Sequence, residues 1–244
     1  MPHPEPRFSR IAAVIADPSR SRMLASLLGG EYRSAGELAK TAGISAQAAS
    51  TQLAQLLEHG LIALRHQGRH KYFCLADDDI AHALEALAMV AERDNVTERW
   101  SKPGYRNLKH ARRCYGHMAG ELGVAQFEML MRCRYLEQTP SGLHLTDAGR
   151  TWLKQLGIDL PTKPVARLAY PCMDWSERKD HLAGTLPKAL LLHYVEQGWL
   201  GTSQDSRELK LTPLGHRWLM PLLLSAGLTP QSSTDPNSAH SQAR

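Results

Sequence analysis

Two helix-start signals on either side of one glycine constrain the fold of this chain more than any other feature of its sequence. Ser34 and Glu37 have the spacing of a capping box, in which each side chain accepts a hydrogen bond from the other residue's backbone N–H. Gly43 ends that first helix, and Ser45 is placed to cap a second helix over residues 46–59. The segment therefore predicts a helix, a glycine-containing turn and a helix, at the length of a helix-turn-helix.

A further helix is predicted directly ahead of this segment. Asp17 is a suitable N-cap for it, and Pro18 falls at the first helical position, where its missing N–H does no harm. Gly29 and Gly30 end the helix. A short helical turn over residues 10–15 is expected before it.

The exposed side of the second helix carries short hydrogen-bonding side chains and no acid. Side chains of this kind contact base edges and phosphates when a helix lies in the major groove of DNA. The candidate positions are Ser45, Gln47, Ala48, Ser50, Thr51 and Gln52. Taken alone, the pattern is explained equally well by a polar helix face in contact with water.

The segment that follows favours DNA binding. Residues 60–64 and 72–75 read as two strands, and residues 65–71 form a basic turn between them. A hairpin with a cationic tip, placed directly after a helix-turn-helix, is a wing that can hold phosphates or enter the minor groove. Its candidate contacts are Arg65, Gln67, Arg69, His70 and Lys71. Residues 1–75 also contain nine Lys and Arg against five acids, which accounts for +4 of the net charge of +5.

Taken together, residues 7–94 resemble the ArsR/SmtB family of bacterial winged-helix repressors. The residues that carry the resemblance are Asp17-Pro18-Ser19-Arg20, Glu37-Leu38-Ala39, Ile44-Ser45, Ser50, Leu53, Leu56-Leu57, Gly60-Leu61-Ile62, Gly68-Arg69 and Tyr72. The resemblance implies a homodimer on a palindromic operator in double-stranded DNA, released by an inducer. Two-fold symmetry would place the half-sites about one helical turn apart.

The metal sites of that family do not carry over to this sequence. Residues 37–42, in the first helix of the helix-turn-helix, contain no cysteine. His82 could begin the other family pattern, but the matching later positions are Arg93 and Val96, which do not bind metals. Lone Cys74 is expected to be a packed apolar residue.

An amphipathic helix is predicted over residues 80–93, where it follows Asp78 and Asp79. One stripe of this helix is apolar and is interpreted either as a dimer seam or as ordinary core. The stripe consists of Leu84, Leu87, Ala88 and Ala91.

The C-terminal half contains an internal repeat. The segment that starts at His117 matches the one at His181, and the segment that starts at Leu145 matches the one at Leu211, at offsets of 64 and 66 residues. Each copy reads as a helix, a strand, a turn, a strand and a Thr-capped helix, so we predict two degenerate winged-helix-like units. The first strands are expected at residues 134–136 and 198–200.

These units are expected to sense a signal or shape a dimer rather than bind DNA. Their turns lack the cations of the wing, and their first helices carry exposed acids. The acids concerned are Glu121, Glu128 and Glu196.

A candidate sensor site lies where the repeats could meet. Small Ala-Gly pairs, at residues 119–120 and 183–184, would let the paired helices approach closely. The side chains then brought around one cleft are Cys114, His117, Cys172, Asp174, Trp175 and His181. Two Cys and two His suit Zn²⁺ or a soft metalloid, and two thiols could instead form a redox pair. The Cys–His spacings differ, at three and nine residues, and neither is a tight metal knuckle. An organic-ligand pocket with aromatic walls and simple packing residues therefore stay open as alternatives.

Composition excludes several other classes of protein. No apolar run reaches the ~18 residues that span a bilayer, and the N-terminus lacks the pattern of a secretory signal. Four scattered cysteines are too few for a disulfide framework, so a cytoplasmic protein with reduced thiols is expected. No motif of a zinc protease, nucleophile elbow or phosphate-binding loop occurs, which argues against an enzyme.

The sequence thus predicts a mainly α-helical chain with small β-hairpins (α+β). Its predicted parts are a winged helix-turn-helix with a dimerisation helix at 1–94, a linker at 95–107, two winged-helix-like repeats at 108–160 and 161–228, and a disordered tail at 229–244. The predicted function is a sequence-specific DNA-binding transcription regulator, a homodimeric repressor released by a metal, redox or small-molecule signal sensed in the C-terminal half. The alternatives are a protein-interaction adaptor without DNA binding and a zinc enzyme.

Overall fold

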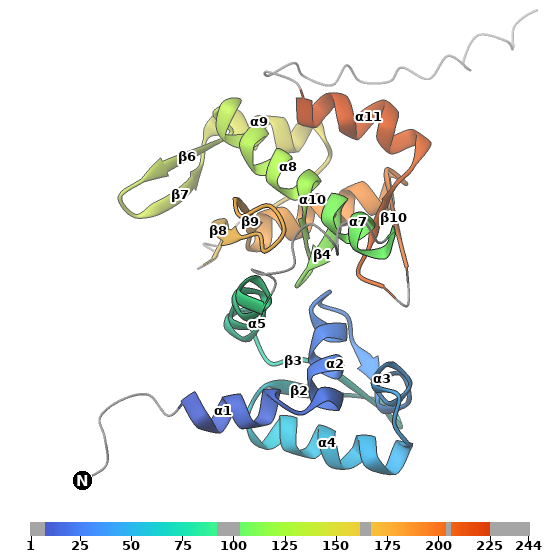
Figure 1. Cartoon of the computed structure of the whole chain (residues 1–244). Coiled ribbons are helices and arrows are strands. Elements are labelled where there is room, and N and C mark those ends of the chain that lie inside the picture. Colours follow the sequence, from blue (N-terminus) through green and yellow to red (C-terminus); the bar gives the residue numbers. More distant parts are fainter. Residues whose placement is uncertain (1–7, 92–102, 162–166, 204–205, 225–244) are drawn as a thin grey trace, which may run out of the picture.

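The structure is a computed structural model that describes residues 8–91, 103–161, 167–203 and 206–224 (Figure 1). Its first 84 described residues form a winged helix-turn-helix module, below the C-terminal half in Figure 1. The elements of the module are α1 (Phe8–Ile15), α2 (Pro18–Leu27), β1 (Arg33–Ser34), α3 (Ala35–Ala42), α4 (Ala46–Glu58), β2 (Ile62–Gln67), β3 (His70–Leu75) and α5 (Asp78–Ala91). The three strands form an antiparallel sheet in the order β1-β3-β2.

The predicted helix starts are confirmed. The side chain of Asp17 accepts hydrogen bonds from two backbone N–H groups at the start of α2. Ser34 and Glu37 make both bonds of the capping box at α3, and Ser45 accepts from the N–H of Ala48 at 3.2 Å. Gly43 ends α3 in the left-handed conformation, at φ 70°. Each cap satisfies a backbone group that would otherwise lose its partner, a contribution of about 1 kcal/mol.

The apolar sides of α2, α3 and α4 meet the inner face of the sheet. Leu38 and Leu56 are fully buried there, and the turn after α4 is closed by Leu61, whose N–H donates to the Leu56 carbonyl at 3.0 Å. The core also contains Met23, Leu24, Leu27, Ala42, Ala49, Leu53, Ile62, Phe73, Leu75 and Ala81.

The C-terminal half repeats one order of elements: hairpin, helix, hairpin, helix. A helix, α7 (Pro103–His110), precedes the first copy. The first copy comprises β4 (Arg112–Cys114), β5 (His117–Ala119), α8 (Glu121–Arg132), β6 (Leu136–Thr139), β7 (Gly142–Leu145) and α9 (Asp147–Gln155). The second comprises β8 (Tyr170–Met173), β9 (Asp180–Ala183), α10 (Thr185–Glu196), β10 (Leu200–Thr202), β11 (Leu209–Leu211) and α11 (Pro213–Leu224).

Positions matched in the sequence repeat occupy equivalent places in the two copies. Gly120 and Gly184 precede α8 and α10 with positive φ angles of 80° and 110°. The hydroxyls of Thr146 and Thr212 each accept a backbone N–H three residues later, both at 3.0 Å. Helix, strand, strand and helix follow the same order as α4, β2, β3 and α5 of the module, but a hairpin stands where the module has α3.

Both copies share one continuous apolar core. α8 packs on β9 of the second copy and α10 packs on β5 of the first. Gln126 and Tyr194, from these two helices, are buried and joined by a hydrogen bond of 3.3 Å. The C-terminal half is therefore held together by packing between the two copies as well as within each of them.

Two predictions about this half need correction, and two of its hairpins were missed. Residues 103–107 of the predicted linker belong to α7, where Pro103 takes the first helical position that proline favours. The first strands begin two residues later than predicted, because Arg134 and Gly198 turn the chain with φ angles of 55° and 67°. The hairpins β4–β5 and β8–β9 were not predicted at all.

Other predicted segments lie outside the described residues. These are residues 95–102 of the linker and the tail at 229–244, together with Arg93 of the helix predicted to end there. Within the described parts, no helix is both long and apolar enough to cross a membrane.

Candidate DNA interface and buried cysteine–histidine cluster

The outer face of α4 carries the predicted base-reading residues. Gln47, Ser50 and Thr51 are exposed, as is Ser45 at the helix start. The Ser50 hydroxyl donates to the Ala46 carbonyl at 3.0 Å, so its oxygen keeps lone pairs that can accept a hydrogen bond. Figure 1 shows α4 on the side of the module opposite to the C-terminal half, which leaves this face open.

Two of the predicted residues take a different place. Ala48 and Gln52 are only partly exposed. The side-chain oxygen of Gln52 accepts a hydrogen bond from Arg20 at 2.7 Å. Arg20 also donates to the oxygen of Gln55, at 3.0 Å, and to the carbonyl of Val14, at 2.6 Å. Arg20 therefore positions α4 against α1 and α2, a role that the sequence did not indicate.

The wing is a regular hairpin whose predicted contacts are all exposed. β2 and β3 pair from Ile62↔Leu75 to Gln67↔His70, and Gly68 turns the chain at φ 58°. The exposed side chains are Arg65, Gln67, Arg69, His70 and Lys71. No acid occurs between residues 59 and 76, so nothing within the hairpin offsets its charge.

The cations of the wing do not all point the same way. Arg65 lies over the ring of Tyr32, with 5.2 Å between its guanidinium carbon and the ring centre. Lys71 pairs with His66 across the strands and so lies on the opposite face from Arg65. Arg69, in the turn, and Lys71 are thus the cations best placed to reach a phosphate.

The C-terminal half contains a buried cluster of two cysteines and two histidines. In β4–β5, Cys114 lies directly opposite His117, and in β8–β9, Cys172 lies directly opposite His181. The four potential ligand atoms all lie within 4.8 Å of one another. The two histidine Nε2 atoms are 3.1 Å apart, and none of the four residues is more than 5% exposed.

Asp174 supports this cluster from one side. Its carboxylate accepts from the N–H of Gly120 at 2.7 Å and from Arg112 at 2.8 Å, and it lies 3.2 Å from Nδ1 of His181. Burial alone would raise the pKa of Asp174, but His181 and Arg112 outweigh it and hold that pKa far below its usual range. Trp175 packs under the Arg112 guanidinium, 4.5 Å from its ring centre. The structure thus brings four of the six predicted residues together in a buried cluster rather than around an open cleft, with Asp174 and Trp175 behind them.

The cluster holds its groups in different protonation states. Burial lowers the pKa of His117 to about 4, so this ring is neutral near pH 7. Burial also acts to lower the pKa of His181, but Asp174 and Cys172 raise it to about 9. The hydrogen bond between the thiols lowers the pKa of Cys172 and raises that of Cys114. Of the two thiols, Cys172 is therefore the one whose deprotonation the surroundings favour.

The cluster lies beside the junction between the two halves. Tyr115, next to Cys114, donates its backbone N–H to the Leu28 carbonyl at 2.6 Å. Tyr170, two residues before Cys172, donates its hydroxyl to Asp78 of α5 at 3.0 Å.

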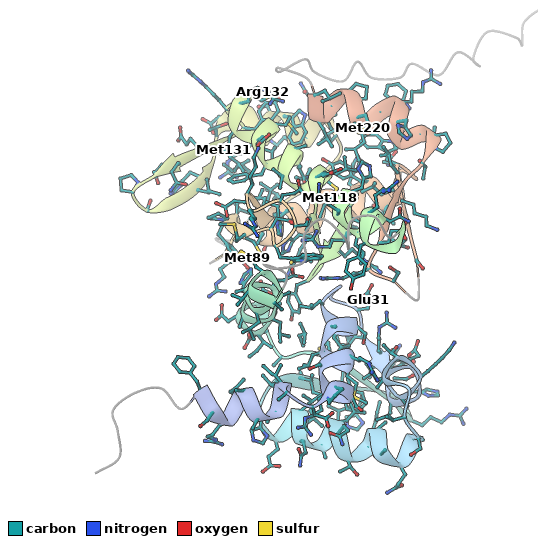
Figure 2. All side chains as sticks on the ribbon, in the orientation of Figure 1. Glu31, Met89, Met118, Met131, Arg132 and Met220 are labelled. Atoms are coloured by element: carbon teal, nitrogen blue, oxygen red, sulfur yellow. The ribbon has the colours of Figure 1, made fainter. Side chains whose placement is uncertain are left out.

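Ion pairs cross the same junction. They join Glu31 to Arg113, Asp78 to Lys188, Asp79 to Arg167 and Glu85 to Arg207. Figure 2 shows Glu31 at the edge of the module that faces the C-terminal half.

One residue of the module reaches the cluster itself. His82 of α5 is half-buried and bonds to Cys172, an interaction that raises the pKa of His82. Its ring also meets the Tyr170 ring edge-on, with the centres 5.3 Å apart. In the sequence, His82 stands out only as the first ligand of a family metal site whose later ligands are missing. No sequence signal predicted its contact with Cys172.

Comparison with known proteins gives matches to a short part of the chain and a match to most of it. A family described as a helix-turn-helix domain matches residues 15–65. The uncharacterized HTH-type transcriptional regulator YdfF of Bacillus subtilis is 36% identical over 212 residues, which cover 86% of this chain and 94% of YdfF. The HTH-type transcriptional regulator CmtR of Mycobacterium bovis is 35% identical over 86 residues, or 35% of this chain and 72% of CmtR.

The similar solved structures described next each cover about a third of this chain. One is the homodimeric winged helix-turn-helix DNA-binding domain of Mb0332 from Mycobacterium bovis, described as a possible ArsR-family regulator. It is 27% identical, covers 35% of this chain and 78% of that domain, and has a TM-score of 0.33. NolR from Sinorhizobium fredii is 28% identical, with 34% and 82% covered and a TM-score of 0.32.

Proposed function

From the premise that the chain belongs to the family of HTH-type transcriptional regulators, we propose that it is a homodimeric repressor that a signal in its C-terminal half releases from operator DNA. The resemblance of residues 7–94 to ArsR/SmtB repressors agrees with that family. One observation carries the proposal. The exposed polar face of α4 lies beside the hairpin β2–β3, whose exposed cations are not offset by any acid within the hairpin.

In this proposal α4 enters the major groove and the wing holds the backbone. Gln47 and Ser50 offer donors and acceptors to base edges, and such contacts set sequence preference. Arg69 and Lys71 neutralise phosphates, and such contacts set affinity for any sequence.

The proposed dimer uses apolar surface that the chain leaves exposed. On α5, Leu87 and Val90 are 51% and 52% exposed, whereas Glu85 on the other side is buried against the C-terminal half. On α1, Phe8 is 75% exposed. Burial of these faces against a second copy would remove apolar area from water. Of the apolar stripe predicted on α5, Leu84 packs on the core and Leu87 is free for the seam.

We assign sensing rather than DNA binding to the C-terminal half. Its hairpins β6–β7 and β10–β11 occupy the place of the wing in each copy, which supports their interpretation as degenerate winged-helix units. The tip of β6–β7 carries Pro140 and Ser141 instead of cations, and Glu121 and Glu128 are exposed on α8. These acids pair with Lys109 and Lys179 and so offset the charge of the cations beside them.

Fluorescence anisotropy with DNA from upstream of the protein's own gene tests the proposal. Wild-type protein should bind this DNA more tightly than unrelated DNA of equal length. Replacement of both Arg69 and Lys71 by Ala should weaken binding to both DNAs alike. The matched control replaces Arg150 and Lys154, two exposed cations of α9, and should bind as wild type does. Equal binding by the wing variant and this control would refute the assignment of the wing, and no binding by the wild type would favour the adaptor.

A further inference from the structure

We propose that Cys114, His117, Cys172 and His181 form a tetrahedral site for a Zn²⁺-class metal ion, and that the ion acts on the module through α5. The ligand set is two thiols and two imidazoles, the combination that holds Zn²⁺ in structural sites. Neither the DNA interface nor the dimer face uses any of these side chains.

The separations of the donor atoms fit such an ion. Zn–S and Zn–N bonds of about 2.3 and 2.0–2.1 Å place the donors of a tetrahedron roughly 3.3–3.8 Å apart. The four donor atoms lie within 4.8 Å of one another, and the two Nε2 atoms lie 3.1 Å apart. Side-chain shifts of a few tenths of an ångström to about 1 Å would therefore complete the tetrahedron.

The unequal Cys–His spacings do not count against the site. In each hairpin the cysteine and the histidine are direct cross-strand partners, at equivalent positions of the two copies. The spacings differ because the loop of the second hairpin, residues 174–179, is longer than the loop of the first, residues 115–116. Each hairpin thus presents one thiol and one imidazole, and an ion would join the two copies.

Burial favours a metal ion over the alternatives. Two imidazoles and two thiols meet in the core of the C-terminal half, where the imidazoles cost free energy unless they find strong partners. Packing alone would explain the two cysteines but would be served better by apolar residues at the positions of the two histidines. An organic ligand would need an open pocket, whereas all four side chains are buried.

Asp174 supplies the outer support that metal-bound histidines usually have. Its carboxylate lies 3.2 Å from Nδ1 of His181, so that Nε2 of His181 faces the other donors. Gly120 and Arg112 hold the carboxylate in place, at 2.7 and 2.8 Å. Asp174 is thus a positioning residue for one of the four ligands.

The second step, from the ion to the DNA-binding module, rests on the proposed function. His82 of α5 bonds to Cys172, and Tyr170, from the same strand as Cys172, bonds to Asp78 of α5. An ion that takes the Cys172 sulfur as a ligand withdraws negative charge from it and so weakens its attraction for His82. Metal binding would therefore alter the contact between the cluster and the helix that carries the proposed dimer face.

Metal titration of the reduced, chelator-treated full-length protein tests the site. Co²⁺ should bind at one equivalent per chain, with the visible bands of a tetrahedral ion and a thiolate charge-transfer band, and Zn²⁺ should displace it. Cys172→Ser and His117→Asn should lose these bands, whereas Cys133→Ser, which alters a cysteine outside the cluster, should keep them. Circular dichroism checks that each variant folds. Asp174→Asn should weaken Zn²⁺ affinity by about 10–100-fold.

Two results would overturn the site. One is wild-type protein that binds no stoichiometric Co²⁺ or Zn²⁺. The other is a folded Cys172→Ser variant with the same spectrum and affinity as the wild type. Quantitative thiol titration without reductant provides a third check, because a stable Cys114–Cys172 disulfide that excludes metal would assign the cluster to redox chemistry.

A second experiment tests the effect of the ion on DNA binding separately from the existence of the site. Operator affinity measured with and without one equivalent of Zn²⁺ should differ at least ~5-fold, the lower end of typical coupling between sites. The difference should vanish in Cys172→Ser and persist in Cys133→Ser. Metal binding with unchanged DNA affinity would overturn the regulatory step and leave the site standing. Metal binding without any DNA binding would instead contradict the proposed function.

Discussion

The ion pair between Glu85 and Arg207 offers a sharp test of how the two halves are joined. Glu85 lies on α5 and is 2% exposed, and its carboxylate meets the guanidinium of Arg207 from the C-terminal half. Replacement of Arg207 by Ala leaves a buried carboxylate without its cation. Loss of one partner of a buried pair costs about 3–5 kcal/mol. For a chain of this size that loss lowers the melting temperature by roughly 6–20 °C.

Equilibrium urea unfolding, with chelator present throughout, measures this cost. The double variant Glu85→Ala/Arg207→Ala provides the control, because it removes the buried charge together with its partner. It should be more stable than Arg207→Ala alone, so the two substitutions should be strongly non-additive. If Arg207→Ala lost less than about 1 kcal/mol, or if the double variant lost the sum of both single effects, the pair would not join the halves as described.

Three further predictions concern the N-terminal module. In a dimer, loss of Arg69 and Lys71 removes four phosphate contacts, so the slope of log K against log salt should become less steep by about 3.6; an unchanged slope contradicts the wing. Replacement of both Leu87 and Val90 by Glu should convert the dimer to a monomer in sedimentation at micromolar concentration, and an intact dimer would place the seam elsewhere. Ser34→Ala removes half of the capping box at α3 and should lower the free energy of unfolding by about 1 kcal/mol, whereas a neutral effect would show that the cap adds no stability.

The helix-turn-helix could be predicted from the sequence because its signals are local. Ser34, Glu37, Gly43 and Ser45 act within one or two turns of the chain, and each has the predicted role in the structure. The wing could be predicted equally well, because its strands are long enough to form six residue pairs, from Ile62↔Leu75 to Gln67↔His70.

The cluster could be predicted only in part, because the register of a hairpin depends on strand pairing and not on local sequence signals. Spacings of three and nine residues look unrelated along the chain, yet both place a cysteine opposite a histidine once the strands pair. The roles of Arg20 and His82 depend on which helices pack together. Their hydrogen bonds cross 32 residues to Gln52 and 90 residues to Cys172, distances at which no spacing rule applies.

A nuclease footprint of the full-length protein on DNA upstream of its own gene tests the central claim most directly. The account predicts two protected half-sites of inverted sequence, with centres about 10–10.5 base pairs, or a multiple of that, apart. Gln47→Ala should alter which sequences are protected, whereas the Arg69→Ala/Lys71→Ala variant should weaken every protected site. Absence of protection at concentrations that shift unrelated DNA, or a single protected site without two-fold symmetry, would contradict a dimeric sequence-specific regulator.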